Sequence, residues 1–337
     1  MALLSLLTAC HKDDPKTWTN TVSSDRMLLV MSAPSIYDTY YTSAFQAIVD
    51  FQIAYAKAIT GNDNVVVIVD AGTKEYYEGK LPEDILITAD VYDIWMRDFA
   101  TVNPKNPVRF KYTWASMTQA ESQQVQNSFK AFASDNSITF NTSNYLLDGG
   151  NVVDNYNGKV ITTTRFMTDN SLTKEQAKSQ LQTLLNATQV AIIEPDEPVL
   201  AHADGMVMWL DENTLLVNDY SSDTAFRASV MTELQASFPG TAIIEVPVVF
   251  TSNGWPGFES ACGVNLNAVM TYKNIYVPTF NMAHDQNAVN LIEQNTTKNV
   301  IAINAEGVCP MGGSARCLTW QIEGENARKL IENARAK

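Results

Sequence analysis

The chain has 337 residues and a mass of 37.3 kDa, with 45% hydrophobic and 18% charged residues, which is the composition of a globular protein with a large core. Asp and Glu outnumber Lys and Arg by 37 to 23, and the formal net charge of −14 repels nucleic-acid phosphates, so we expect no nucleic-acid partner. No apolar run reaches the roughly 18 residues of a membrane-spanning helix. Cationic small molecules or peptides suit such a surface, although solubility alone also accounts for it.

The first ten residues, MALLSLLTAC, are apolar and end in Leu7-Thr8-Ala9-Cys10. This ending resembles a bacterial lipobox, whose cysteine becomes the lipidated first residue of the mature protein, although no basic segment precedes the apolar run. We therefore predict a lipoprotein signal remnant over 1–10 and a polar tether over 11–24. The protein would be exported, facing the periplasm or on the cell surface, with a membrane contact only through a lipid anchor at Cys10. The alternative is a frayed cytosolic terminus.

From residue 25 to residue 337, short runs rich in Val and Ile alternate with helical patterns, and no Pro-rich linker or low-complexity segment separates them. Near-continuous apolar runs predict strands that are covered on both faces. The predicted strands are 27–31, 65–69, 85–88, 190–193, 215–217, 243–249 and 300–303. The predicted helices are 44–59, 119–133, 172–185, 225–238, 288–294 and 324–336. We therefore predict a single α/β domain over 25–337.

Three further segments predict β-hairpins, and each follows a short polar stretch. NVVDNYNGKVITTT at 151–164 turns at Asn157-Gly158, which is a strong signal for a tight turn. MVMWLDENTLLVND at 206–219 and NAVMTYKNIYVPTF at 267–280 also turn at polar residues. This is a recurring unit of polar start and hairpin with helices between, although the units share too little sequence to be called a repeat from spacing alone.

Cys317 lies in GVCPMGGSARCLTWQI, close behind two glycines. Glycines let a backbone or a substrate come close, so a nucleophilic thiol is a candidate here. If Cys10 carries a lipid, Cys262, Cys309 and Cys317 remain, and at least one of these three stays free or pairs between chains. A disulfide between Cys262 and Cys309 is the pairing that spares Cys317, and buried free thiols are the alternative.

Two of the three histidines, His202 and His284, lie outside the predicted tether. His284 precedes Asp285, which suits a helix cap, so an exposed turn is the plain interpretation. His202 and Asp204 stand two positions apart at the start of a predicted strand, so their side chains would point the same way. A satisfied polar pair and a metal site are the alternatives, but no third metal ligand stands out. Asp98 ends a cluster of Trp, Arg and two Asp in VYDIWMRDFATVNP.

Five motifs, WMRD, DGGN, HAD, NLN…YVPTF and GGSARCLTWQ, follow one another between about residues 27 and 322. In this order they resemble the guanidino-group-modifying enzymes, and more narrowly the family that joins Porphyromonas-type peptidylarginine deiminases with agmatine deiminases. The resemblance implies the pentein fold, a five-bladed α/β propeller of pseudo-fivefold ββαβ units with a central active site. It also implies that neither a metal nor an organic cofactor is needed.

The resemblance further implies a role for each motif residue. Cys317 would attack the guanidinium carbon as a thiolate, and His202 would pass a proton to the departing ammonia and then activate water. Asp98 and Asp204 would bind the planar guanidinium cation from opposite sides. The other predicted site residues are Trp95 as an aromatic wall, Gly150 for close backbone approach, Asn267 or its rival Asn265 near the thiol, and Arg316, whereas Arg97 would form a structural ion pair.

The predicted reaction is hydrolysis of the guanidino group of an arginine-type substrate, peptidyl or free, to a ureido product and ammonia through a covalent thiouronium on the cysteine. The sequence departs from agmatine deiminases at Asp148, where they carry Glu, and at Arg316, where they commonly carry His. FKYTWASM lacks the arginines that hold a terminal carboxylate in peptide-specific members, so Arg316 or Arg165 would have to hold it. The alternatives are an agmatine deiminase, an amidinotransferase and a catalytically inactive, cation-binding surface lipoprotein.

Overall fold

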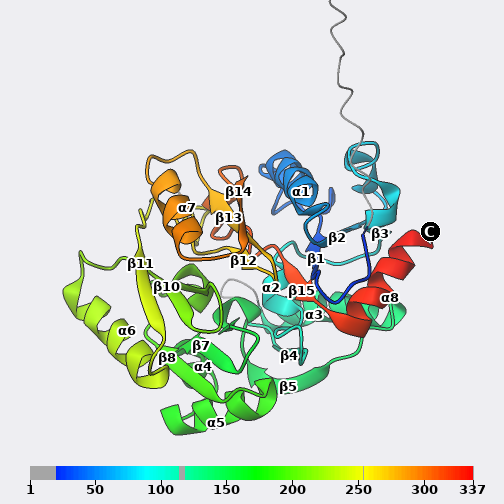
Figure 1. Ribbon diagram of the computed structural model, residues 1–337. Helices are drawn as coiled ribbons and strands as arrows, with labels where there is room; N and C mark the ends of the chain where they lie inside the picture. The colour runs from blue at the N-terminus through cyan, green and yellow to red at the C-terminus, as the bar shows by residue number, and fades with distance from the viewer. Residues whose placement is uncertain (1–19, 114–117, 253, 337) are drawn as a thin grey trace, which may run out of the picture.

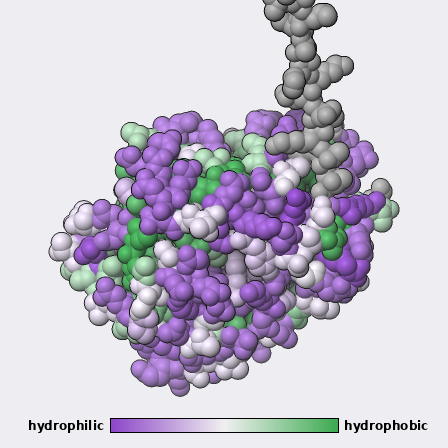
Figure 2. Space-filling view, in the orientation of Figure 1, coloured by the Kyte–Doolittle hydropathy of each residue, from purple (hydrophilic) through white to green (hydrophobic). Residues whose placement is uncertain are grey.

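The computed structural model describes residues 20–113, 118–252 and 254–336. The predicted lipobox and most of the predicted tether lie outside the described residues, as does part of FKYTWASM. Within the described ranges, no helix combines the length and the apolar character that are needed to cross a membrane. Hydrophilic residues cover most of the face seen in Figure 2, and hydrophobic residues reach the surface mainly on the side of α7 (Asp285–Gln294) and β11 (Ala242–Val246).

The fold repeats a unit of two antiparallel strands, a helix, and a third strand parallel to the second. β6 (Val153–Asp154) pairs antiparallel with β7 (Lys159–Thr163), and after α5 (Lys174–Leu185) the chain returns as β8 (Gln189–Ile193), parallel to β7. Two more units follow with the same pairing. The first consists of β9 (Val207–Trp209), β10 (Thr214–Asn218), α6 (Thr224–Ser237) and β11. The second consists of β12 (Val269–Met270), β13 (Asn274–Thr279), α7 and β14 (Asn299–Asn304).

The two ends of the chain together complete a fourth unit. β15 (Trp320–Ile322) pairs antiparallel with β1 (Leu28–Ser32), and α1 (Phe45–Ile59) leads to β2 (Asn64–Val69), which lies parallel to β1. This sheet gains a fourth strand, β3 (Leu86–Thr88), and α8 (Gly324–Arg335) follows β15. The last predicted motif, GGSARCLTWQ, is thereby brought beside the first predicted strand.

The fifth unit is reduced. β4 (Val108–Lys111) and β5 (Asn141–Leu146) are parallel and are connected by α3 (Gln119–Asp135), while the antiparallel partner shrinks to one bridge between Val102 and Val108. The described residues thus form a mixed α/β fold with five units of this kind, which follow one another around the molecule in Figure 1. The remaining short elements are α2 (Met96–Phe99), α4 (Arg165–Asp169), η1 (Lys74–Tyr76), η2 (Glu83–Ile85), η3 (Gly149–Asn151), η4 (Ala203–Gly205) and η5 (Cys309–Met311).

Local sequence explains most of these elements. α3 and α5 each begin with a capping box, in which Thr118 pairs with Glu121 and Thr173 pairs with Gln176. β1 and β2 are buried at every position, as their continuous apolar runs predict. The three predicted hairpins, the seven predicted strands and the six predicted helices are confirmed to within a few residues, with the strand predicted over 243–249 ending at Val246.

One structural prediction at the site is wrong. His202 and Asp204 do not begin a strand, because η4 occupies 203–205 and β9 begins only at Val207. Their side chains are therefore separated by a tight helical turn and not by the two-residue period of a strand. β4, β5, β15, α2, α4 and the short η helices were not predicted.

Candidate active site

Cys317 lies in the turn between Gly313 and β15, and its side chain is buried. Nδ2 of Asn267 donates to Sγ of Cys317 at 3.1 Å, while Oδ1 of Asn267 accepts the N–H group of Ser314 at 3.2 Å. Oδ2 of Asp204 lies 3.8 Å from the sulfur. One amide side chain thus both orients the thiol and anchors the turn that carries it.

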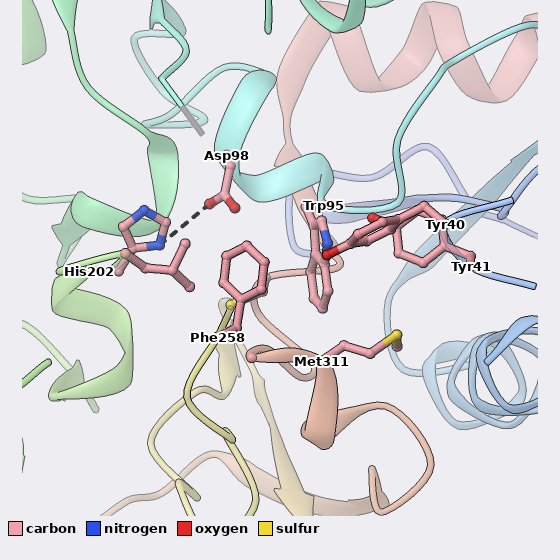
Figure 3. A pocket seen from close by; sticks show the side chains of 10 residues that line it. Tyr40, Tyr41, Trp95, Asp98, His202, Phe258 and Met311 are labelled. Atoms are coloured by element: carbon pink, nitrogen blue, oxygen red, sulfur yellow. Dashed lines mark ion pairs between the residues drawn. The ribbon is translucent and has the colours of Figure 1, made fainter. Parts of the chain in front are cut away.

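His202 comes directly before η4 and is buried between two carboxylates. Its Nε2 lies 3.4 Å from Oδ2 of Asp148, and its Nδ1 lies 3.8 Å from Oδ1 of Asp98, the contact drawn in Figure 3. Asp148 also accepts the backbone N–H group of Thr113 at 2.7 Å. An imidazole held between two acids is stabilised in its charged form, and it can serve as a proton donor.

The backbone leading to His202 is held by Glu197. Its carboxylate accepts the N–H groups of Val199 at 2.6 Å and Leu200 at 3.1 Å, and also that of Ala201. Ala201 has a φ of +56°, a left-handed conformation that residues other than glycine rarely adopt. The three hydrogen bonds stabilise this conformation immediately before the histidine.

Two carboxylates enter the site from different units. Asp98 is on α2, and its Oδ1 accepts the N–H group of Gly150 at 3.1 Å. Asp204 is on η4, and its Oδ2 pairs with Nη1 of Arg316 at 3.1 Å. Arg316 is itself buried, and its Nη2 donates to the carbonyl of Val152 at 2.9 Å. Arg316 therefore links Asp204 to the backbone just before β6.

Two glycines are required by close packing around these groups. A Cβ atom at Gly150 would lie 2.5 Å from Nδ1 of His202 and 2.7 Å from Oδ1 of Asp98. A Cβ atom at Gly313 would lie 2.5 Å from the Trp95 ring and 2.8 Å from Cβ of Cys317. Such distances are far inside van der Waals contact, so any other residue would displace a site side chain.

The thiol and the histidine line two connected hollows. The inner cavity has a volume of about 20 Å³, and the outer cleft has about 470 Å³. Leu200, His202, Gly312 and Cys317 line both. In Figure 3 the rings of Trp95 and Phe258 lie between His202 and Asp98 on one side and Tyr40 and Tyr41 on the other. The inner cavity is thus a narrow aromatic slot with one acidic end.

Burial dominates the pKa values of the ionisable groups. It raises the pKa of Asp98 to about 7, an effect that nearby His202 opposes. Burial alone would lower the pKa of His202, but Asp98, Asp148 and Asp204 outweigh it and raise that pKa to about 9. Burial, together with the charges of Asp204 and Asp98, raises the pKa of the Cys317 thiol well above its usual value. The empty site therefore favours a bound cation.

The three arginines named from the sequence have internal partners. Arg97 donates from Nη2 to Gln321 at 2.7 Å, so the predicted structural ion pair is replaced by a hydrogen bond. Arg165 pairs with Asp169 at 3.0 Å and donates to the carbonyl of Val199. Arg316 lines neither the inner cavity nor the outer cleft, so its direct contact with substrate stays a prediction.

The structure brings the predicted site residues together. Asn267, and not its rival Asn265, contacts the thiol, since Asn265 donates to the carbonyl of Pro278 and to Asp285. Sequence reasoning missed part of the wall of the slot, namely Tyr40, Tyr41, Phe258 and Met311. Their surroundings contain no polar motif that would have singled them out. Among the described residues, no group of His, Cys, Asp and Glu side chains is arranged to hold a metal ion.

Comparison with known proteins relates this geometry to a family. The model of the Porphyromonas-type peptidyl-arginine deiminase family matches residues 23–322. Curated proteins gave no significant match. An agmatine deiminase of C. jejuni with substrate bound has a TM-score of 0.73 and 16% identity, over 95% of this chain and 99% of that chain.

Two further solved structures share the fold. The agmatine deiminase of Enterococcus faecalis has a TM-score of 0.72 and 15% identity, over 90% of this chain and 95% of that chain. DDAH from Pseudomonas aeruginosa, complexed with citrulline, has a TM-score of 0.52 and 10% identity, over 88% of this chain and 98% of that chain. The mixed α/β fold is therefore that of the pentein-superfamily deiminases.

Proposed function

Because the chain belongs to the Porphyromonas-type peptidyl-arginine deiminase family, whose members are hydrolases of amidine C–N bonds, we propose that it deiminates an arginine-type substrate, peptidyl or free. The product would be a ureido compound and ammonia. The observation that carries this proposal is that one buried thiol and one histidine line both hollows, together with Asp98 in the inner cavity and Asp204 in the outer cleft.

Asp98 and Asp204 would bind the substrate's guanidinium. A guanidinium keeps its charge at neutral pH and presents planar N–H donors, which match carboxylate oxygens. A bound cation would change the ionisation of Asp98 most. Its buried carboxyl has a pKa of about 7, and the cation would stabilise the ionised form. Trp95 would place an aromatic face against the same cation.

Cys317 would attack the guanidinium carbon. The bound cation counters the Asp204 and Asp98 charges that raise the pKa of the thiol, so the substrate itself promotes formation of the thiolate. The thiol proton passes to solvent, the sulfur–carbon bond forms, and a tetrahedral adduct results. His202, with a pKa of about 9, is protonated at neutral pH and donates its proton to the departing amine, so the carbon–nitrogen bond breaks and ammonia leaves.

The remaining thiouronium would be hydrolysed. The now neutral His202 takes a proton from water, whose oxygen bonds to the same carbon. The carbon–sulfur bond then breaks, and the ureido product and the free cysteine are restored. Over the full cycle, one guanidinium and one water give one ureido group and one ammonium ion. Asn267, 3.1 Å from the sulfur, would hold the thiol in line during both steps.

The test is ammonia release from the full-length protein supplied with agmatine, free arginine and arginine-containing peptides. Turnover that is lost in Cys317→Ser supports the proposal. Product that forms only when an amine acceptor is added would identify an amidinotransferase instead. Binding of guanidino compounds without any turnover would indicate a catalytically inactive, cation-binding protein.

An agmatine deiminase that uses the same residues is the second candidate. One observation favours it over free arginine, because no Lys or Arg is among the described residues that line the two hollows. Agmatine keeps the amine of arginine but has no carboxylate, so it needs no cationic partner there.

We also propose that the protein is exported and anchored by a lipid on Cys10. The sequence that ends in Leu7-Thr8-Ala9-Cys10 supports this. The disulfide between Cys262 and Cys309 supports it independently, because such bonds persist in oxidising compartments. Mass spectrometry of membrane fractions would reveal an acylated Cys10, and an unmodified Cys10 in those fractions would refute the proposal.

A further inference from the structure

The outer cleft is much larger than a guanidino group requires. Its volume of about 470 Å³ is that of an ordinary small-molecule pocket, roughly 300–1,000 Å³. It reaches the thiol through residues that it shares with the inner cavity, so it lies where the rest of a bound substrate must extend. A small amine or an amino acid would fill only part of it.

The charge of this cleft is mainly negative, and His202 beside the thiol is the one cationic group among its described lining residues. Its walls include Asp196, Glu197, Asp223 and Glu259 in addition to Asp204 at the thiol, and no Lys or Arg is among the described residues that line it. Asp223 and Glu259 are exposed and are free of ion pairs among the described contacts. Away from His202, a substrate carboxylate would find no cationic partner among these residues and would meet repulsion.

The cleft also presents aromatic surface. Phe250 is 56% exposed and stacks on Tyr220 with ring centroids 6.4 Å apart. Tyr220 donates to Asp196 at 2.7 Å and makes an edge contact with Phe226. Aromatic faces beside carboxylates suit the aliphatic stems and charged ends of Lys and Arg side chains.

We propose that the outer cleft binds the polypeptide on both sides of an internal arginine and selects positively charged neighbours. The substrate class would be an arginine inside a basic peptide, with its side chain reaching into the inner slot and no terminal carboxylate beside it. This inference rests on the proposed deiminase activity. It explains why the described walls lack an arginine for a carboxylate, and why a cleft adjoins the inner cavity at the thiol.

The experiment compares capped pentapeptides with a central arginine flanked by Lys or by Glu, with butylguanidine as a substrate that has no further charge. We expect kcat/KM for the Lys-flanked peptide to exceed that for the Glu-flanked peptide by at least about tenfold at low salt, and the ratio to shrink as salt screens the exposed charges. The Asp223→Asn/Glu259→Gln double variant should lower this ratio about tenfold, because each exposed ion pair contributes a factor of about 1.5 to 5.

The first substitution keeps helix α6 intact, because Asp223 caps it through the N–H group of Phe226 and Asn caps equally well. A Glu75→Gln/Glu293→Gln variant is the matched control, since it removes the same charge from exposed sites that do not line the cleft and should leave the ratio unchanged. Equal turnover of both peptides alongside active hydrolysis of butylguanidine would overturn this inference alone. Failure of every guanidino compound to release ammonia would overturn the deiminase proposal itself.

Discussion

Breaking the disulfide between Cys262 and Cys309 should reduce both stability and substrate binding. The bond joins the segment before β12 to η5, and the two segments also share hydrogen bonds from the N–H group of Trp255 to Pro310 at 2.6 Å and from that of Ala261 to Cys309 at 2.9 Å. Phe258 on one segment and Met311 on the other both line the inner cavity. The bond therefore ties together two walls of the slot.

The size of the stability effect follows from the length of chain that the bond closes. The two cysteines are 47 residues apart, and a loop of that length loses about 4 kcal/mol of stability when its cross-link is removed, if the effect is entropy of the unfolded chain. A domain of about 300 residues unfolds with an entropy of about 0.6 kcal/mol/K, so we expect the melting temperature to fall by about 6 °C.

Calorimetry with and without a strong reductant measures this directly, with a thiol titration to verify that the bond has opened. The Cys262→Ala/Cys309→Ala variant should melt near the reduced wild type, and Cys317→Ser, which removes a free thiol, should melt near the oxidised wild type. We also expect KM to rise more than kcat falls. An unchanged melting temperature in protein with three titratable thiols besides Cys10 would refute the entropic reasoning.

Three further predictions concern the site. kcat/KM should rise through about pH 7 as Asp98 ionises to accept the cation, and it should fall through about pH 9 as His202 loses the proton that it donates, so a flat profile from pH 6 to 10 would contradict these roles. Gly150→Ala should lower kcat/KM by about 100-fold by displacing His202 or Asp98, whereas Gly205→Ala, whose added methyl group meets nothing within 4 Å, should have little effect. Arg316→Gln should lower the free energy of unfolding by about 3–5 kcal/mol in denaturant titrations, because it leaves the buried Asp204 unpaired. Arg316→Lys keeps a positive charge and should lower the free energy of unfolding clearly less. Equal losses in the two variants would argue against the ion pair.

Much of the fold could be predicted because local signals and tertiary structure agree. The Asn157-Gly158 turn and the buried strands such as 64–69 have patterns that few other structures satisfy. β5 was missed because its sequence, NTSNYL, is polar and mostly exposed, so no apolar period marks it. α2 was missed because four residues are too few to show a helical period, yet it carries Asp98.

The chemically active residues could be predicted because their side-chain types are specific to the reaction. The residues that form the walls of the slot could not be predicted. Cys317, His202 and Asp204 stand out as rare or charged residues beside apolar runs. Tyr40, Tyr41 and Phe258 are ordinary aromatic residues in irregular segments, and they meet at the slot only through long-range packing. His202 and Asp204 were correctly predicted to lie close together, but the strand on which that prediction rested is absent. Both residues lie on a turn whose direction depends on Glu197 and Ala201.

The balance of charge in the site gives a reason for an arginine at position 316. When all groups are ionised, Asp98, Asp148 and Asp204 contribute three negative charges, and His202 and Arg316 contribute two positive charges, so one more cation would balance the charge of the site. Arginine does not lose its proton at neutral pH, whereas a histidine can give up and regain one, as His202 does in the proposed reaction. The charge that offsets Asp204 therefore stays constant while His202 gives up and regains its proton. The guanidinium supplies the positive charge that balances the site, so the site binds it at the start of the cycle. The ureido product is neutral and does not supply this charge, so the site releases it at the end.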